Sequence, residues 1–411
     1  MTPLAALEKA APVRPGGAAD AIDGVVPSWV TAPASVADAV EVMRIAAEHG
    51  LCVVPRGAGT RLRWGLPPAS CDLLIETGGL DRVIEHAAGD LVVTVEAGLT
   101  MDRLAEVLAA QGQRLALDRP IAGSTVGGTL ATAAWGPLRL GYGTARDLII
   151  GVTIVRADGS LAKSGGKVVK NVAGYDLGKL FTGSYGTLGL IVEAAFRLHP
   201  VPPARSYVTC EVGDFARAGA VVQEVLRSSV VPSAIEMDAA AGAAGPMGPI
   251  TVAVLIEGVA AGIGARAEVV AGLLGAAAQI DAEPPAWWGR YPDGATLLEV
   301  TAPPMALASL GETALPALLA AGAGIRGSAG AGHWYVGVPG GPVHEVAQLV
   351  IGLRSAALAH GGSVIVRVRQ AGLHETMDLW GPAPTLPLLH RVKDQFDPGH
   401  RLAPGRFVGG I

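Results

Sequence analysis

The chain has 411 residues and a formal net charge of −5 at pH 7, with neither a basic tail nor a block of like charges, and this pattern argues against a nucleic-acid partner. Half of the residues are hydrophobic but only 4% are aromatic, so Ala, Val and Gly fill the apolar share. The 57 glycines are about twice the usual frequency, which predicts many tight turns or many places where the backbone approaches a ligand.

The N-terminus and the cysteines indicate where the protein works. Residues 1–21 do not combine a basic flank with a long apolar run, so we expect no secretory signal, and no apolar stretch is long enough to span a bilayer. Cys52, Cys71 and Cys210 are scattered and form no iron–sulphur spacing. We therefore expect a cytoplasmic protein with buried thiols, whose association with a membrane, if any, would run through partners.

The first elements in the chain read as the beginning of a βαβ unit. Apolar spacing predicts a helix over residues 37–49, capped by Ser35, and then a buried strand over residues 51–54. Further strands are expected over residues 72–76, 83–86 and 91–96, followed by a helix over residues 100–111.

The loop after the first buried strand reads Pro-Arg-Gly-Ala-Gly-Thr at residues 55–60. Gly57 and Gly59 allow successive backbone N–H groups to turn to one side, where they can hold an anion, and Thr60 and Arg56 add a hydroxyl and a charge. The pattern is neither a P-loop nor a G-x-G-x-x-G fingerprint. On these residues alone, a phosphate-binding loop and an ordinary Pro/Gly turn remain equally good interpretations.

A second glycine-rich block occupies residues 123–134, where nearly every position is small. Such a segment lets the backbone approach a ligand, and close packing of a helix against a neighbour is the alternative. Residues 141–147 follow, then a strand over residues 148–156, a block at residues 170–176, a short helix over residues 177–181, a Gly-Ser-Tyr-Gly-Thr-Leu-Gly segment at residues 183–189 and a strand over residues 190–198.

A domain boundary is expected at Pro200, Pro202 and Pro203, which punctuate the chain after this strand. Beyond them, strands and longer helices alternate up to residue 369, which favours an α+β sandwich with helices on one face of an antiparallel sheet. An amphipathic helix over residues 386–396 and a loop over residues 397–406 follow.

The ordered blocks at residues 55–60, 123–134, 141–147 and 170–189 resemble the FAD-binding oxidoreductases of the vanillyl-alcohol-oxidase type, which carry a PCMH-type flavin domain. Among these, the FAD-binding subunits of glycolate oxidases are the most similar. The resemblance implies an α+β protein: a PCMH-type FAD-binding domain of two α/β subdomains at residues 1–203, completed by residues 371–411, and an α+β, ferredoxin-like cap at residues 204–370.

The resemblance also assigns parts of FAD to residues. The loop at residues 55–60 would hold the pyrophosphate, the block at residues 123–134 would lie along the cofactor, and residues 141–147 would line its edges. The expected cofactor-binding residues are Pro55, Arg56, Gly57, Ala58, Gly59, Thr60, Gly123, Ser124, Thr125, Gly127, Gly128, Ala131, Gly141, Gly143, Thr144, Asp147 and Ile191. Neither residues 55–61 nor residues 123–137 contain His or Cys, so we expect FAD to be held without a covalent bond.

Oxidation of a 2-hydroxy acid needs a cation for the carboxylate and a base for the hydroxyl proton, besides the flavin. We predict His333 as the base, Arg367 as the carboxylate partner and Lys170 as a cation near the flavin; a structural or solvated role is the alternative for each. The paired histidines of metal-assisted relatives are absent, so no catalytic metal is expected.

The resulting prediction is an FAD-binding subunit of a glycolate or 2-hydroxy-acid oxidase (dehydrogenase) complex, an FAD-dependent oxidoreductase that passes electrons to a partner. The resemblance implies a second flavin subunit and an iron–sulphur subunit as partners. Two alternatives stay open: an FAD-bearing but non-catalytic scaffold subunit of such a complex, and a stand-alone flavin oxidase or dehydrogenase for another alcohol or hydroxy acid.

Overall fold

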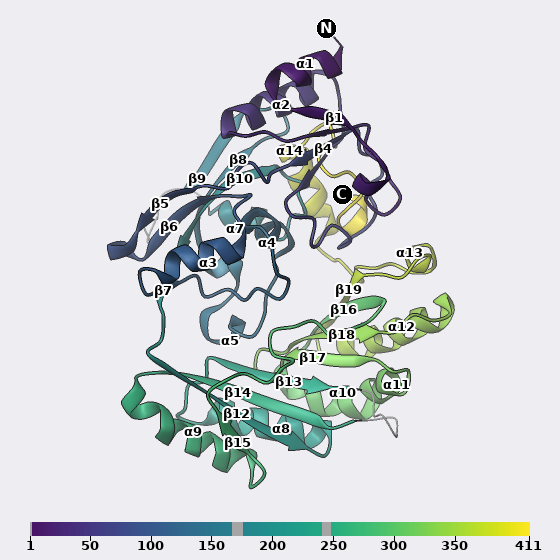
Figure 1. Cartoon of the computed structure of the whole chain (residues 1–411). Helices are drawn as coiled ribbons and strands as arrows, with labels where there is room; N and C mark the ends of the chain where they lie inside the picture. Colours follow the sequence, from purple (N-terminus) through teal and green to yellow (C-terminus); the bar gives the residue numbers. More distant parts are fainter. Residues whose placement is uncertain (1, 167–175, 241–247) are drawn as a thin grey trace. The chain divides into compact units, whose positions relative to one another are not determined.

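The computed structural model describes residues 2–166, 176–240 and 248–411, and the chain divides into two units (Figure 1). The first unit comprises Met1–Ala134, Thr144–Val201 and Ala383–Ile411, and the second comprises Trp135–Gly143 and Pro202–Pro382. The division follows Val201 and Pro382, whereas boundaries after residues 203 and 370 were expected from the sequence. Lys170 and most of its block lie outside the described residues.

The first unit begins with a four-stranded sheet in the order β1-β2-β4-β3. Strands β2, β4 and β3 run parallel, and β1 is antiparallel to β2. The strands and the two helices that belong with them are β1 (Val13–Pro15), β2 (Trp29–Thr31), β3 (Val53–Arg56), β4 (Leu73–Glu76), α1 (Pro3–Ala10) and α2 (Val36–Glu48). The helix predicted after Ser35 is confirmed as α2, and the Ser35 hydroxyl accepts the backbone N–H of Asp38 at 3.1 Å. Leu7, Met43 and Val53 are buried together in the core that these elements share.

A five-stranded antiparallel sheet completes the first unit, in the order β5-β6-β10-β8-β9. Its strands are β5 (Val83–Ala87), β6 (Val92–Glu96), β8 (Ile149–Val155), β9 (Leu161–Gly165) and β10 (Leu190–Arg197). The accompanying elements are α3 (Met101–Ala109), α4 (Val126–Thr132), α6 (Ala145–Leu148), α7 (Gly178–Phe181) and the short strand pair β7 (Gln113–Arg114) and β11 (His199–Pro200).

The C-terminal segment returns to the first sheet after the second unit. Helix α14 (Leu386–Phe396) leads into a loop that runs beside β3, where the N–H of Val53 donates to Arg401 O and the N–H of Ala403 donates to Val53 O, both at 2.8 Å. Lys393 is fully buried, and its ammonium donates to Thr187 O at 2.8 Å, Asp397 Oδ2 at 2.7 Å and Leu402 O at 2.9 Å. All three ammonium protons therefore have an acceptor.

The second unit is built on an eight-stranded antiparallel sheet in the order β15-β12-β14-β13-β17-β18-β16-β19. The strands are β12 (Ala204–Val212), β13 (Ala234–Ala239), β14 (Ile250–Gly258), β15 (Gln279–Asp281), β16 (Thr296–Thr301), β17 (Gly324–Ser328), β18 (His333–Val338) and β19 (Ser363–Val368). The helices are α8 (Phe215–Arg227), α9 (Ala260–Leu274), α10 (Leu307–Thr313), α11 (Leu315–Ala320), α12 (Val343–Ala359) and α13 (Leu373–Thr376). The predicted α+β class is confirmed. Among the described helices, none has the length and apolar character that a membrane crossing needs.

Two stretches belong to the second unit because of identifiable contacts. Residues 135–143, which include α5 (Arg139–Tyr142), contact it through Tyr142, whose hydroxyl donates to Glu257 at 2.9 Å. The stretch before residue 383 is held by Arg354, whose guanidinium donates to the backbone oxygens of Asp378 at 2.9 Å and Leu379 at 3.2 Å. The partner of the first stretch is 115 residues away in the sequence, and the partner of the second is 24–25 residues away.

We predict that Lys393→Met destabilises the first unit by about 3–5 kcal/mol, because the substitution leaves the Asp397 carboxylate buried without its cation. Urea unfolding followed by circular dichroism measures the loss. Glu106→Gln serves as the control, since its exposed pair with Arg103 should change stability by less than about 1 kcal/mol. Equal effects of the two substitutions would contradict the prediction.

Candidate functional site

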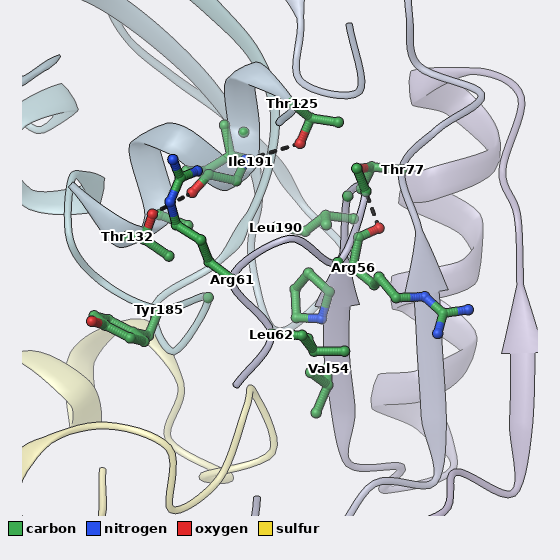
Figure 2. A pocket seen from close by; sticks show the side chains of 18 of the residues that line it. Val54, Arg56, Arg61, Leu62, Thr77, Thr125, Thr132, Tyr185, Leu190 and Ile191 are labelled. Atoms are coloured by element: carbon green, nitrogen blue, oxygen red, sulfur yellow. Dashed lines mark hydrogen bonds between the residues drawn. The ribbon is translucent and has the colours of Figure 1, made fainter. Parts of the chain in front are cut away.

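A pocket in the first unit lies where β3 ends (Figure 2). Its walls are the end of β3 with the following loop, helix α4, the loop before β10 with the first residues of β10, and Arg406 from the C-terminal segment. Pro55, Gly57, Ala58, Gly59 and Thr60, all expected at the cofactor, line this pocket. Their role in binding the cofactor stays a prediction.

The loop presents backbone donors that have no acceptor within the described part of the chain. The N–H groups of residues 57–60 make no intramolecular hydrogen bond there, and Gly59 has a φ of +73°. Gly57 leaves no space for a side chain, because a Cβ would lie 2.2 Å from Oγ1 of Thr125. N–H groups that have no intramolecular acceptor and lie beside a pocket are suited to an anionic ligand.

Arg56 does not supply the charge expected of it. Its guanidinium donates to Asp20 at 2.9 Å and also pairs with Glu76, and its side chain points away from Arg61 and Thr125 in Figure 2. Hydrogen bonds from Arg14, and then from Arg56, hold the pKa of Asp20 well below its usual range. The Arg56 charge is thus already paired with two carboxylates, although the residue itself lines the pocket.

Arg61 is a cation at the pocket that was not expected there from the sequence. It is 6% exposed, lines the pocket and extends toward Thr132 and Ile191 in Figure 2. Its Nη1 donates to Ser124 Oγ at 3.2 Å, and Ser124 Oγ also lies 3.3 Å from Thr60 Oγ1. The position of Arg61 directly after a glycine-rich turn was a sequence signal for a ligand contact. The neighbouring residues in the sequence did not indicate that its side chain would be buried.

The second glycine-rich block lines the pocket and also packs closely against a neighbouring segment. Thr125, Gly128 and Ala131, which are predicted to bind the cofactor, line the pocket. Gly127 also touches it, but its N–H donates to Ala97 O at 2.7 Å, and a Cβ there would lie 2.9 Å from the Ala97 side chain. Close packing, the alternative interpretation, therefore explains why this position is glycine.

Thr125 caps α4 and so occupies one of the helix's first N–H groups. Its Oγ1 accepts the N–H of Gly128 at 3.2 Å, and Gly123, with φ of +72°, donates its N–H to Asp102 at 2.7 Å. The free donors of the pocket consequently lie in the loop after β3 rather than in α4.

Six of the residues expected at FAD do not line this pocket, namely Gly123, Ser124, Gly141, Gly143, Thr144 and Asp147. Gly141 belongs to the second unit, where its N–H donates to Ser233 O at 3.0 Å, and Gly143 follows α5 with φ of +81°. Asp147 accepts the N–H and the hydroxyl of Thr144, both at 2.8 Å, and so caps the short helix α6. The Thr144–Asp147 contacts are local and the Gly141 contact is structural, and the assignment of all six residues to FAD stays a prediction.

The loop before β10 contributes residues that the expected site omitted. Tyr185, with φ of +56°, and Gly186, with φ of +77°, line the pocket, and a Cβ on Gly186 would lie 3.2 Å from Pro55. The Tyr185 ring contacts Phe407. The sequence shows this loop as a glycine-rich block, but it does not show that the loop contacts β3. Ile191, at the start of β10 and predicted to bind the cofactor, also lines the pocket.

In the second unit, two predicted catalytic residues lie near the buried carboxylate of Glu299. Arg367 Nε donates to Glu299 Oε2 at 2.7 Å, and Trp135 Nε1 donates to Glu299 Oε1 at 3.1 Å. Burial alone would raise the pKa of Glu299, but Arg367 and Trp135 together hold it below its usual value. Arg367 thus already has a carboxylate partner inside the protein.

His333 lies edge-on to Trp135, with ring centroids 5.7 Å apart. Its Nδ1 is 2.8 Å from Ala331 O, an arrangement in which Nδ1–H donates and Nε2 is the basic nitrogen. Burial lowers the pKa of His333, and the charge of Arg139 lowers it further. Lys170, the third predicted catalytic residue, is outside the described residues. Within residues 2–166, 176–240 and 248–411, no three His, Cys, Asp or Glu side chains gather as a metal site would require.

Residues 27–165 match the family described as FAD binding domain. The glycolate oxidase subunit GlcD of Bacillus subtilis (strain 168) is 31% identical over 212 residues, which cover 51% of this chain and 45% of that relative. D-2-hydroxyglutarate dehydrogenase of Xanthomonas citri is 33% identical over 190 residues, which cover 46% of this chain and 40% of that relative. The chain thus spans about half the length of the curated relatives it matches.

Solved structures resemble the whole chain. Chitooligosaccharide oxidase matches with a TM-score of 0.69 and 16% identity over 97% of both chains. An alkyldihydroxyacetonephosphate synthase matches with a TM-score of 0.69 and 17% identity, over 93% of this chain and 78% of that one. At these identities the likeness shows the fold alone.

The matched segment and the pocket agree on the cofactor. Residues 27–165 include β3, its loop and α4, and the unsatisfied N–H groups of residues 57–60 suit the diphosphate of a dinucleotide. The prediction of an FAD-binding domain is therefore confirmed for residues 27–165, and FAD is confirmed as the cofactor.

We predict that Gly57→Ala raises the dissociation constant of FAD by about 10-fold or more, a loss of about 1.4 kcal/mol, because the new Cβ would lie 2.2 Å from Thr125 Oγ1. Flavin fluorescence titration of the apoprotein measures the change. Gly89→Ala is the matched control, since nothing lies within 4 Å of the Cβ position there.

The double variant Gly57→Ala, Thr125→Ala removes the clashing hydroxyl and should recover part of the FAD affinity. If Gly57→Ala bound FAD as tightly as Gly89→Ala does, the loop would not be the cofactor cradle.

Proposed function

We propose that this chain, whose residues 27–165 form an FAD-binding domain, is an FAD-dependent oxidoreductase of 2-hydroxy acids and works as the FAD-binding subunit of a glycolate-oxidase-type complex. The observation that carries the proposal is the row of unsatisfied N–H donors at residues 57–60, inside the segment that matches FAD-binding proteins. The similar proteins named glycolate oxidase subunit and D-2-hydroxyglutarate dehydrogenase support the substrate class.

Oxidation of a 2-hydroxy acid to a 2-oxo acid removes two electrons and two protons from the hydroxyl-bearing carbon and its oxygen. Bound FAD would supply the two-electron acceptor for this chemistry. The protein has to hold the substrate carboxylate and accept the hydroxyl proton.

We propose that His333 accepts the hydroxyl proton. Burial keeps its imidazole neutral near pH 7, because the pKa is below its ordinary value, and a neutral imidazole is able to take a proton. The contact of Nδ1 with Ala331 O orients the ring and leaves Nε2 as the acceptor. Trp135 lies against the ring and restricts its rotation.

The pairing of Arg367, the predicted partner of the substrate carboxylate, favours the alternative of a non-catalytic subunit. Arg367, the residue predicted to bind the carboxylate, donates to buried Glu299 instead. A chain whose own arginine is occupied in this way suits an FAD-bearing, non-catalytic subunit of the complex. In that alternative, substrate oxidation takes place in a partner chain.

Reduced FAD needs an electron acceptor, and we propose that a second flavin subunit and an iron–sulphur subunit supply that path. The naming of one relative as a glycolate oxidase subunit supports a multi-subunit assembly. Co-purification of the chain with its natural partners tests this part of the proposal.

We further propose that FAD is held without a covalent bond. The loop at residues 55–61 and the segment at residues 123–137 contain no His or Cys. Cys71 is the buried thiol near the loop, and burial raises its pKa to about 12, so it stays protonated and a poor nucleophile near pH 7.

We expect anaerobic glycolate or D-lactate to bleach the FAD absorbance of the purified chain, and His333→Gln to slow this bleaching by about 100-fold or more, the usual contribution of a general base. Stopped-flow spectroscopy measures the rate. Dithionite reduction is the control, since it should be equally fast in both proteins.

Bleaching that requires the partner chains would assign the chain to the non-catalytic alternative. Bleaching by other alcohols, but by neither acid, would instead indicate a stand-alone oxidase or dehydrogenase.

Acid precipitation tests the mode of FAD attachment. We expect the yellow colour to remain in the supernatant, because no covalent bond is proposed. A protein pellet that stayed yellow after repeated washing would overturn this expectation.

A further inference from the structure

Arg61 has a feature that FAD binding by backbone donors does not explain. It is 94% buried, and across the described residues no carboxylate lies within 4 Å of its guanidinium. Its Nη1 donates to Ser124 Oγ, and its Nε is buried with no hydrogen-bond partner. Figure 2 places this side chain in the pocket, along the wall that holds Thr132.

A buried cation without a counter-ion is costly, because the protein interior does not replace the lost hydration. The same loop shows the usual solution at Arg56, which pairs with Asp20 and Glu76. Within the part of the chain that the structure describes, the Arg61 guanidinium contacts a neutral hydroxyl and the Trp64 ring, whose centroid is 5.6 Å away. The site around Arg61 is therefore short of one negative group.

We propose that Arg61 is the counter-ion of the FAD pyrophosphate. The hydroxyl of Ser124 joins Arg61 to Thr60, so the guanidinium is continuous with the hydroxyl and N–H donors of residues 57–60. The pyrophosphate is the anionic part of oxidised FAD, and an arginine fork matches phosphate oxygens in a charge-assisted hydrogen bond. This inference rests on FAD binding and is independent of the proposed substrate.

The test uses the full-length apoprotein and two probes, FAD and ADP. ADP carries the diphosphate but no flavin, so it reports contacts to the phosphates alone. We expect Arg61→Gln to weaken both ligands by about 10- to 100-fold, as expected for a lost charge-assisted hydrogen bond. Arg61→Lys retains the charge and should recover part of the loss.

Arg63→Gln is the matched control. It removes the same charge at a position two residues further along, where the Arg63 side chain is 66% exposed. It should leave both affinities unchanged. Circular dichroism and the thermal midpoint of each apoprotein establish that the variants are folded.

The midpoint potential of bound FAD distinguishes a contact of Arg61 with the pyrophosphate from a contact with the isoalloxazine. The proposal predicts the same potential in Arg61→Gln and the unsubstituted protein. Unchanged ADP affinity, or a lowered potential with normal ADP binding, would overturn it. If instead ADP and FAD affinities fall as expected but neither glycolate nor D-lactate reduces the flavin, the role of Arg61 stands and the proposed substrate class fails.

Discussion

The close approach of the β3 loop to Thr125 is the constraint on which the cofactor site depends. The loop and the start of α4 come together with no space for a methyl group at Gly57. This contact joins an element of the parallel sheet to one packed beside the antiparallel sheet, and the pocket has walls from both. Thr125 caps α4 through the same hydroxyl that Gly57 approaches. Helix capping and loop position therefore depend on a single side chain.

Two arginines five positions apart have opposite roles at this site. Arg56 holds the N-terminal segment against the first sheet through Asp20 and Glu76, so its charge contributes to the fold. Arg61 lies in the pocket with a hydroxyl as its hydrogen-bond acceptor. The distribution of carboxylates decides which cation remains open to a ligand. Neither the spacing of the two arginines nor the residues beside them indicates this difference.

Local features of the sequence predicted much of the fold and part of the site. The cap of α2 and the glycine loop after β3 each involve residues within a few positions of one another. Both can therefore be recognised from a short segment of the sequence. The pairing of Arg56 with Asp20 spans 36 residues, and the contact between Thr60 and Ser124 spans 64. Such contacts depend on how the sheets pack, which hydrophobic periodicity does not specify. For the same reason, the placement of Gly141 in the second unit and the pairing of Arg367 with Glu299 were missed.

Because the C-terminal segment returns to β3, the residues that support the loop after β3 are synthesised long after the loop itself. Arg406 donates to the backbone oxygens of Leu62 and Trp64, both at 2.7 Å, across separations of 344 and 342 residues. The ribosome makes the FAD loop early, but its supporting arginine emerges only after the entire second unit. Contacts between residues so far apart in the sequence carry a cost in loop-closure entropy. If the second unit folds first, the flexible chain between Arg406 and its partners is shorter and this cost is smaller. Until Arg406 has been made, the nascent chain lacks one of the residues that line the pocket.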